Sequence, residues 1–326
     1  MSILVTGGAG YVGSHCVAVL HAAGEDVVVL DDLMRGHRAA VNPKIRLYAG
    51  SLSDPVYVGE MFRRERIEAV FHFASLSLAG ESMKKPGRYF LNNVAGTVNL
   101  LEVMCAHGCP PLVFSSTAAV YGHPTSNPIR EDALKRPMSP YGESKLMVEN
   151  VLKWYDAAYG LRHVAFRYFN VAGAVSDGGI GEDHRPETHL VPIVLRAARE
   201  KTPVKVFGTD YQTPDGTCVR DYIHVEDLVD AHLAALQYLR GGGVSDVFNL
   251  GLGHGFSVRE IIETARRVTG AAIPAEAAPR RPGDPAELVA LTEKAERVLG
   301  WKPKHLTPDE IIASAWRWHR SHSEGY

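Results

Sequence analysis

Short apolar runs alternate with longer stretches in which apolar residues recur every three or four positions along the first half of the chain. The short runs are typical of buried strands, and the longer stretches are typical of amphipathic helices. Strands are predicted at residues 3–6, 26–30, 45–49, 69–73, 111–115 and 163–167. Helices are predicted at residues 14–23, 56–65, 93–107 and 141–159. Continuously apolar strands that alternate with helices predict an α/β fold with a parallel, doubly wound sheet of the Rossmann type.

The second half of the chain is more mixed. Glycine and proline are frequent at residues 172–192 and again at 271–285, which predicts loops. We therefore predict a first domain at residues 1–170, which contains the parallel sheet, and a smaller mixed α/β domain at residues 171–326 that binds substrate. The boundary is soft, because elements of the second domain can interleave with those of the first.

The overall charge is nearly balanced, since 35 basic and 37 acidic residues give a formal net charge of −2. No basic stripe stands out, so nucleic acid is not expected as a partner. No apolar run approaches about 18 residues and no signal peptide precedes the first strand. These observations favour a cytoplasmic protein with no membrane partner.

The four cysteines, Cys16, Cys105, Cys109 and Cys218, are scattered along the chain. Cys105 and Cys109 are spaced to share one face of a helix, but no second pair or nearby histidine cluster completes four ligands. We therefore expect buried, reduced thiols and no metal site.

A glycine-rich loop lies between the first strand and the first helix, where residues 7–13 read GGAGYVG. Glycines at these spacings permit a tight turn, a close approach of the backbone to a pyrophosphate, and close packing of helix on strand. A plain β-to-α turn can show the same glycines, but Asp31 ends the second strand about 20 residues later, where a carboxylate binds an adenosine ribose. Because a carboxylate repels a 2′-phosphate, NAD is favoured over NADP. Arg35 and Arg38 are the residues that would hold a phosphate instead.

Two short motifs supply candidate catalytic groups. Tyr141 and Lys145 are spaced i, i+4 at the start of a predicted helix, so both side chains lie on one face. The Lys145 ammonium is expected to stabilise a phenolate at Tyr141 and to lower its pKa from about 10 towards neutrality. Residues 114–117 (Phe-Ser-Ser-Thr) end a predicted strand, where ligands of a doubly wound sheet bind and hydroxyls can contact a reacting oxygen. Either motif alone can arise by chance, but the two in this order predict an active site.

In order along the chain, these motifs resemble those of the extended short-chain dehydrogenase/reductase family. The matching segments are the glycine loop and residues 30–32, 71–74, 92–93, 114–122 and 141–145. Three later segments, 167–170, 216–225 and 278–284, resemble the substrate part of those members that interconvert UDP-glucose and UDP-galactose. The resemblance covers essentially the full chain. It implies that the chain inverts C4′ of a UDP-sugar with bound NAD, and that it forms a homodimer through the helices at 93–107 and 141–159.

The resemblance also implies roles for individual residues. Thr117, Tyr141 and Lys145 match the catalytic set, with Tyr141 as the base. The residues that match cofactor contacts are Gly7, Gly10, Tyr11, Val12, Asp31, Leu52, Phe73, Ala74, Asn92, Tyr141, Lys145 and Tyr168. Those that match substrate contacts are Thr117, Tyr141, Asn170, His189, Leu190, Arg220, Arg281 and Asp284. Arg281 is expected at the diphosphate and Asp284 at the uridine ribose, since arginine suits a diphosphate by forked hydrogen bonding.

Several positions depart from the family pattern. Ser51 replaces an aspartate that contacts adenine, which weakens the expected retention of NAD, and Ser77 replaces a lysine. Thr188 and His189 stand where the family has paired asparagines near the uracil. Leu288 falls near the position that gates N-acetylated sugars, so epimerisation of a UDP-N-acetylhexosamine or a UDP-uronic acid stays open.

Two other functions are disfavoured by particular residues. A 4,6-dehydratase would carry an acidic pair where this chain has Ala118 and Ala119. A non-catalytic NAD sensor on the same fold would be expected to lose Tyr141 or Lys145, and both are present.

Overall fold

The computed structural model describes residues 1–281 and 283–326, which form two compact units. The first unit contains Met1–Gly122, Leu134–Arg167 and Val229–Phe248. The second unit contains His123–Ala133, Tyr168–Leu228 and Asn249–Tyr326. Each unit therefore takes segments from both halves of the sequence, and the division into domains at residue 170 stays a prediction.

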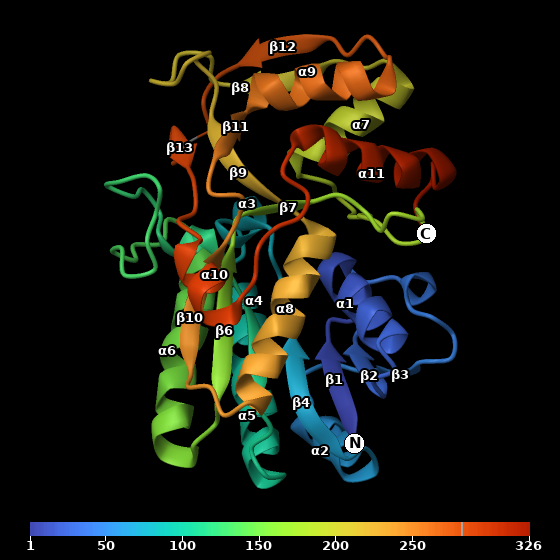
Figure 1. Ribbon diagram of the computed structural model, residues 1–326, viewed down its shortest axis with the longest axis vertical. Helices are drawn as coiled ribbons and strands as arrows, with labels where there is room; N and C mark the ends of the chain where they lie inside the picture. The colour runs from blue at the N-terminus through green and yellow to red at the C-terminus, as the bar shows by residue number, and fades with distance from the viewer. Residues whose placement is uncertain (282) are drawn as a thin grey trace. The chain divides into compact units, whose positions relative to one another are not determined.

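A seven-stranded sheet is the main element of the first unit (Figure 1), with the strand order β10-β6-β5-β4-β1-β2-β3. The strands are β1 Ser2–Thr6, β2 Val27–Asp31, β3 Arg46–Ala49, β4 Ile67–His72, β5 Leu112–Thr117, β6 His163–Tyr168 and β10 Asp246–Leu250. β1 pairs in parallel with β2 and β4, and the pairs β2–β3 and β4–β5 are also parallel. The predicted α/β fold with a doubly wound sheet is confirmed. The chain order reverses between β1 and β4, which is where such sheets bind ligands.

Helices complete the core of the first unit. Buried side chains of the strands, such as Leu4, Val70 and Phe114, pack with Leu101 and Leu152 from helices. The helices are α1 Tyr11–Ala22, α2 Pro55–Arg64, α3 Ala79–Ser82, α4 Pro86–Tyr89, α5 Gly96–Ala106, α6 Pro140–Tyr159, most of α8 Val225–Arg240, and the 3-10 turns η1 Arg38–Ala40 and η3 Ala118–Val120. A π-helical segment, η2 Phe90–Ala95, precedes α5, whereas a regular helix was predicted from residue 93.

α6 has clear capping residues at both ends. The Gly142 N–H donates to Ser139 Oγ at 3.2 Å, and Pro140 occupies the first helical position. Gly160 ends the helix with φ of +69°, a left-handed conformation that favours glycine. These signals fix the start of α6 and therefore the position of the Tyr-x-x-x-Lys motif in its first two turns.

The second unit combines short strands with three packed helices. β9 pairs antiparallel with β11 and parallel with β7 and β13, while β8 pairs parallel with β12. Val194, Ile262 and Ile312, one from each of α7, α9 and α11, are buried in a common core. The elements are β7 Asn170–Ala172, α7 Leu190–Glu200, β8 Val204–Phe207, β9 Val219–His224, β11 Gly255–Ser257, α9 Val258–Thr269, β12 Ala275–Ala278, β13 Glu287–Leu288, α10 Glu293–Leu299 and α11 Pro308–Ser321.

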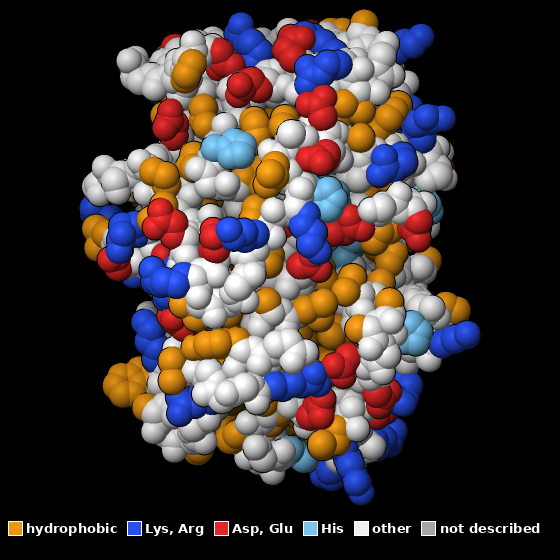
Figure 2. Space-filling view, viewed as in Figure 1, with side chains coloured by type: hydrophobic (Ala, Val, Ile, Leu, Met, Phe, Trp, Pro, Cys, Tyr) orange, Lys and Arg blue, Asp and Glu red, His pale blue; other side chains and the backbone are white. Residues whose placement is uncertain are grey.

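The surface reflects the balanced charge of the sequence. On the face shown in Figure 2, lysine and arginine side chains are interspersed with aspartate and glutamate side chains. Among the described residues, no helix combines the length and the apolar character needed to cross a membrane.

Candidate active site

The glycine loop packs directly against the residues that follow β4. The Phe73 and Ala74 N–H groups donate to the Thr6 carbonyl oxygen at 2.9 and 3.1 Å. Gly7 has φ of +70°, and a Cβ there would lie 2.5 Å from the Ala74 nitrogen. Residue 7 must therefore be glycine, because any side chain would separate the loop from this part of the backbone.

α1 starts within this loop. A Cβ at Gly13 would lie 2.1 Å from the Gly7 carbonyl oxygen, so Gly13 lets the first helical turn pack on the loop. α1 begins at Tyr11, three residues before the predicted start at residue 14, because the glycine loop itself supplies the first helical turn. At the N-cap, Gly10, no side chain caps the helix, and the first turn carries no acidic residue. The N–H groups of this turn, including those of Tyr11 and Val12, therefore suit an anion such as a pyrophosphate.

Asp31 lies at the end of β2, beside the same loop. Its carboxylate accepts hydrogen bonds from the Ala9 and Leu33 N–H groups at 2.9 and 2.8 Å. Burial raises the pKa of Asp31, and the two backbone hydrogen bonds oppose that rise. The glycine cradle, the uncapped helix start and this carboxylate together fit a dinucleotide whose ribose hydroxyls bind Asp31.

Gly13→Ala is expected to weaken NAD binding by about 10–100-fold, because separating α1 from the loop costs about 1–3 kcal/mol. The contact is with backbone, so no side chain can move aside to relieve it. The measurement is the Kd for NAD together with the fraction of purified chains that carry it. Gly59→Ala is the matched control, since Gly59 lies in α2 and an added Cβ would have no atom within 4 Å. Equal NAD binding by the two variants would contradict this account of the loop.

The three predicted catalytic side chains meet at the carboxyl end of β5. Thr117 is the last residue of β5, and its hydroxyl lies near enough to the Tyr141 phenol to lower the pKa of that group. Lys145 lies one turn further along α6, and its Nζ donates to the Ser115 carbonyl oxygen at 2.7 Å. The same ammonium lies 4.9 Å from the centre of the Phe114 ring. Two consecutive turns of α6 are therefore bound to one strand end.

Close packing at residue 142 makes this arrangement possible. A Cβ at Gly142 would lie 2.7 Å from the Ala119 carbonyl oxygen, so glycine lets the first turn of α6 approach η3. Thr117 also orders η3, because its hydroxyl accepts the Ala119 N–H at 3.2 Å. The backbone between β5 and η3 is thus set by the same threonine that contacts Tyr141.

The pKa of Tyr141 is raised, which corrects the expectation that Lys145 lowers it. Burial raises this pKa, and the hydrogen bond with Thr117 lowers it. Lys145 does not reverse the effect, because it is itself buried and its ammonium is directed to the Ser115 carbonyl. Burial lowers the pKa of Lys145 from 10.5 to about 7.

Lys145→Met is expected to flatten the pH dependence of the free energy of unfolding between about pH 7 and pH 10.5. In this window the unfolded Lys145 keeps a proton that the folded one has lost, so the stability of the wild type rises with pH. Below the window both states hold the proton, and the cost of burying the charge is present in full. Urea titrations at the two ends of the window measure the difference. Lys153→Met, an exposed site on the same helix, should leave the slope unchanged, and an equal slope in both variants would contradict the prediction.

A buried ion pair lies next to the catalytic strand end. Arg167 of β6 donates from Nε and Nη2 to the Glu149 carboxylate at 2.8 and 2.5 Å, with side chains 3% and 1% exposed. Ser116 Oγ donates to the same carboxylate at 2.6 Å, and Arg167 Nη1 donates to the Tyr121 hydroxyl at 2.8 Å. Glu149 lies one turn beyond Lys145, so this pair fixes α6 to both β5 and β6. Sequence reasoning missed it, since residues 18 positions apart show no local pattern.

The remaining predicted cofactor contacts lie in separate places. Leu52 follows β3 and is buried, and its carbonyl oxygen accepts the Asn99 side-chain amide at 3.0 Å. Asn92 is half-buried in η2 and donates to the Asn93 side chain at 3.0 Å. Tyr168 ends β6 and belongs to the second unit. Their roles toward the cofactor stay predictions.

Three of the predicted substrate contacts lie close to β8 and β9 of the second unit. Arg220 Nη2 donates to the Asp284 carboxylate at 2.5 Å, so these two side chains are paired. The Arg281 guanidinium lies 4.1 Å from the centre of the Phe207 ring. Both guanidinium groups are thus held in place, and their contact with a diphosphate stays a prediction.

The other predicted substrate contacts lie in β7 and around the start of α7. Asn170 donates from its side-chain amide to the Asp221 carbonyl oxygen at 3.0 Å. Leu190 is the first residue of α7, and His189 is its N-cap. The Nδ1 atom of His189 lies 2.8 Å from Glu182 Oε1, so this nitrogen faces a carboxylate.

Sequence analysis missed the side chains that surround His189. Glu182, His184, Glu187 and His189 each offer a ligand atom, and these atoms lie within 4.8 Å of one another. The signal was present in the sequence as Glu-x-His-x-x-Glu-x-His. The pattern differs from the cysteine-based spacings that are typical of zinc sites.

Comparison with known proteins gives matches along the whole chain. A model of the NAD dependent epimerase/dehydratase family matches residues 3–251. The UDP-glucose 4-epimerase of Lacticaseibacillus casei is 55% identical over 327 residues, which cover 100% of this chain and 99% of the relative. A crystal structure of a UDP-glucose 4-epimerase is similar with a TM-score of 0.98 and 52% identity, covering 100% of this chain and 99% of that one. The Bifidobacterium longum UDP-glucose 4-epimerase, crystallised in complex with NAD+ and UDP, is similar with a TM-score of 0.94 and 38% identity, covering 100% of both chains.

Proposed function

This chain belongs to the NAD dependent epimerase/dehydratase family, and from that premise we propose that it interconverts UDP-glucose and UDP-galactose. The observation that carries the proposal is the hydrogen bond from Lys145 to Ser115, which holds the start of α6 at the end of β5 and places Tyr141 near Thr117. The glycine loop lies in the same unit. NAD rather than NADP is the cofactor, because the Asp31 carboxylate suits free ribose hydroxyls and repels a 2′-phosphate.

The proposed reaction inverts C4′, and side chains of the protein transfer the proton of the 4′-hydroxyl group. NAD, when bound, accepts a hydride from C4′ and returns it to the opposite face. In its phenolate form Tyr141 takes the proton of the 4′-hydroxyl group and becomes a neutral phenol, and Thr117 donates a hydrogen bond to the same sugar oxygen. Tyr141 returns the proton to that oxygen once C4′ is inverted, so no net oxidation occurs. Lys145 holds the start of α6 on β5 and thereby keeps Tyr141 beside Thr117.

Inversion requires that the sugar turns while the nucleotide stays anchored. Guanidinium groups suit this task, because they bind a diphosphate through forked, charge-assisted hydrogen bonds. The ion pair of Arg220 with Asp284 and the stacking of Arg281 on Phe207 restrict both guanidinium groups before a ligand binds. The proposed nucleotide contacts are Asn170, His189, Leu190, Arg220, Arg281 and Asp284.

We also propose a homodimer in the cytoplasm. α6 exposes large apolar side chains, with Met147, Trp154 and Tyr159 at 42%, 75% and 55% exposure, and such side chains are typical of surfaces that a partner covers. All four cysteines are free thiols, as expected in a reducing compartment. The mass of the protein in solution, measured by light scattering, tests the dimer, and a monomeric mass would contradict it.

The proposed reaction is tested by incubating the purified protein with UDP-galactose, without added cofactor, and separating the nucleotide sugars by chromatography. UDP-glucose is the expected product. Because Ser51 stands where the family pattern has an aspartate, the same assay is repeated with added NAD. If only a UDP-N-acetylhexosamine or a UDP-uronic acid were converted, the proposed substrate would be wrong and the proposed inversion at C4′ would stand. No conversion of any UDP-sugar would contradict the proposal and favour a non-catalytic NAD-binding protein.

A further inference from the structure

Just before α7, one eight-residue segment of the second unit carries four side chains with potential ligand atoms that converge. Glu182, His184, Glu187 and His189 all come from this segment, and their ligand atoms lie within 4.8 Å of one another. We propose that these four residues form a binding site for a divalent transition metal, with Zn²⁺ as the metal. Neither the proposed epimerase reaction nor the cofactor chemistry requires such a site.

The N···O distances in the cluster are compatible with a tetrahedral centre. His189 Nδ1 lies 2.8 Å from Glu182 Oε1 and 3.2 Å from Glu187 Oε1. His184 Nδ1 lies 3.1 Å from Glu182 Oε1 and 3.6 Å from Glu187 Oε2. Tetrahedral Zn²⁺ with bonds of about 2.0–2.1 Å to nitrogen and oxygen separates its ligands by about 3.3 Å. The four N···O separations bracket this value, and Glu187, which reaches the two imidazoles through different oxygens, would turn to present one of them to the ion.

The charge of the segment also calls for a cation. The Glu182 and Glu187 side chains are only 5% and 8% exposed, and both approach the same two imidazoles. Two buried carboxylates at this separation are costly unless positive charge lies between them. In the metal-free chain the imidazoles of His184 and His189 face both carboxylates, and a divalent ion would take the place of the imidazole protons at the point where the four side chains converge. Two imidazole nitrogens with two carboxylate oxygens are a ligand set that Zn²⁺ accepts, whereas Mg²⁺ and Ca²⁺ prefer oxygen ligands alone.

The surroundings of the segment support a metal site. Glu187 Oε1 accepts the N–H groups of Thr188 and His189 at 2.6 and 2.7 Å, which orients the carboxylate as outer hydrogen bonds do in metal centres. Glu182, His184 and Glu187 also line a pocket open to solvent, so an ion has a path to the site.

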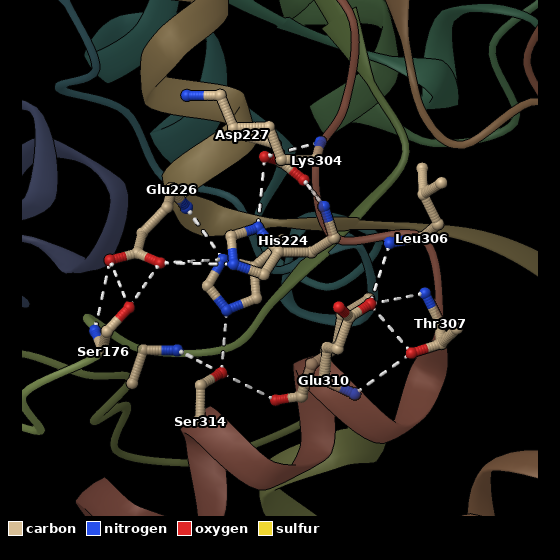
Figure 3. Close-up of polar contacts among 12 residues, drawn as sticks. Ser176, His224, Glu226, Asp227, Lys304, Leu306, Thr307, Glu310 and Ser314 are labelled. Carbon is tan, nitrogen blue, oxygen red and sulfur yellow. Dashed lines mark hydrogen bonds and ion pairs between the residues drawn. The ribbon is translucent and has the colours of Figure 1, made fainter.

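A second cluster of potential metal ligands in the same unit is held together by hydrogen bonds instead. His224, Glu226 and His305 also bring ligand atoms within 4.8 Å of one another. Figure 3 shows, however, that both ring nitrogens of His224 are already used. Nδ1 accepts the Glu226 N–H at 3.1 Å, and Nε2 hydrogen-bonds Ser314 Oγ at 2.8 Å. This group is therefore a polar network, and it supplies a matched control for the proposed metal site.

Four protein ligands leave no open coordination position, so the proposed ion is structural rather than catalytic. His189 is the N-cap of α7, and the ion would bind this helix start to the preceding segment through Glu182 and His184. Because metal binding contributes to folding free energy, the ion should also stabilise the second unit.

The test uses the full chain, expressed without a histidine tag, stripped with a chelator and then titrated with Zn²⁺. We expect one Zn²⁺ per chain by elemental analysis and a higher midpoint of thermal unfolding in the loaded protein. His184→Gln should weaken Zn²⁺ binding at least about tenfold, since even outer-sphere changes cost about 10–100-fold in affinity. Glu182→Gln is a second variant with the same expected direction. His305→Gln, in the control cluster, should bind Zn²⁺ like the wild type.

Several outcomes would overturn the proposal. One is an absence of saturable Zn²⁺ binding by the stripped wild type, which would mean that protonated imidazoles alone balance the two carboxylates. A second is equal affinity in His184→Gln and His305→Gln. A third is stoichiometric Mn²⁺ or Ni²⁺ binding in place of Zn²⁺, which would overturn the choice of metal. These measurements need no sugar substrate, so they are independent of the epimerase assay.

Discussion

Replacing Tyr141 with phenylalanine is expected to lower kcat for the interconversion of UDP-galactose and UDP-glucose by about 10²–10⁴-fold. The change removes the group proposed to take and return the 4′-hydroxyl proton, and it leaves Thr117 without the neighbouring phenol. The ring itself is retained, so the packing of α6 against η3 should persist. The measurement is kcat and KM for UDP-galactose, with the amount of bound NAD determined on the same preparation.

Tyr57→Phe is the control for this experiment, because Tyr57 lies in α2 and contacts the Tyr48 ring rather than the catalytic strand end. Its kcat should match that of the wild type. If Tyr141→Phe kept near-normal kcat while retaining NAD, Tyr141 would not be the base. If it lost NAD together with activity, the loss would reflect cofactor binding, and the assignment of the base would lack support.

Glu149→Leu is expected to lower the free energy of unfolding by about 3–5 kcal/mol, because it leaves the Arg167 guanidinium buried without its carboxylate. Arg167 is 3% exposed and has two hydrogen bonds to Glu149, so water cannot easily replace them. Ser116 loses its acceptor in the same variant. Equilibrium denaturation with urea measures the change.

The double variant Glu149→Leu/Arg167→Met separates the cost of the orphaned charge from the value of the pair. Replacing both partners with apolar side chains of similar size should recover most of the lost stability. Glu143→Leu, in the first turn of the same helix and away from Arg167, controls for removal of a carboxylate from α6. A loss no larger than that of Glu143→Leu would contradict the role of the buried pair.

Much of the sheet could be predicted because its strands are buried on both faces. β1 and β2 are fully buried along their length, so their apolar runs are continuous and short. β10 was not predicted, although it joins the same sheet next to β6, because it lies in the second half of the chain far from its partner in sequence. The π-helical segment η2 was also missed, since hydrophobic spacing does not distinguish a π-turn from a regular helical turn.

In the candidate site too, features set by neighbouring residues could be predicted, and features set by residues distant in sequence could not. Tyr141 and Lys145 could be placed because they share one helix, and the residues around Thr117 could be placed because they end a strand. The raised pKa of Tyr141 could not be foreseen, because it depends on burial and on the direction of the Lys145 ammonium. The pair of Arg220 and Asp284 joins residues 64 positions apart, so only the fold reveals that these two predicted ligands contact each other.

The most direct test of the central claim follows the hydrogen at C4′. UDP-galactose carrying deuterium at C4′ is incubated with the protein in ordinary water, and the UDP-glucose formed is analysed by mass spectrometry and NMR. The product is expected to keep the deuterium at C4′, because the hydrogen leaves and returns as hydride within the site while Tyr141 exchanges only the hydroxyl proton. Loss of the deuterium to solvent would show that C4′ is deprotonated instead, and it would contradict the proposed mechanism.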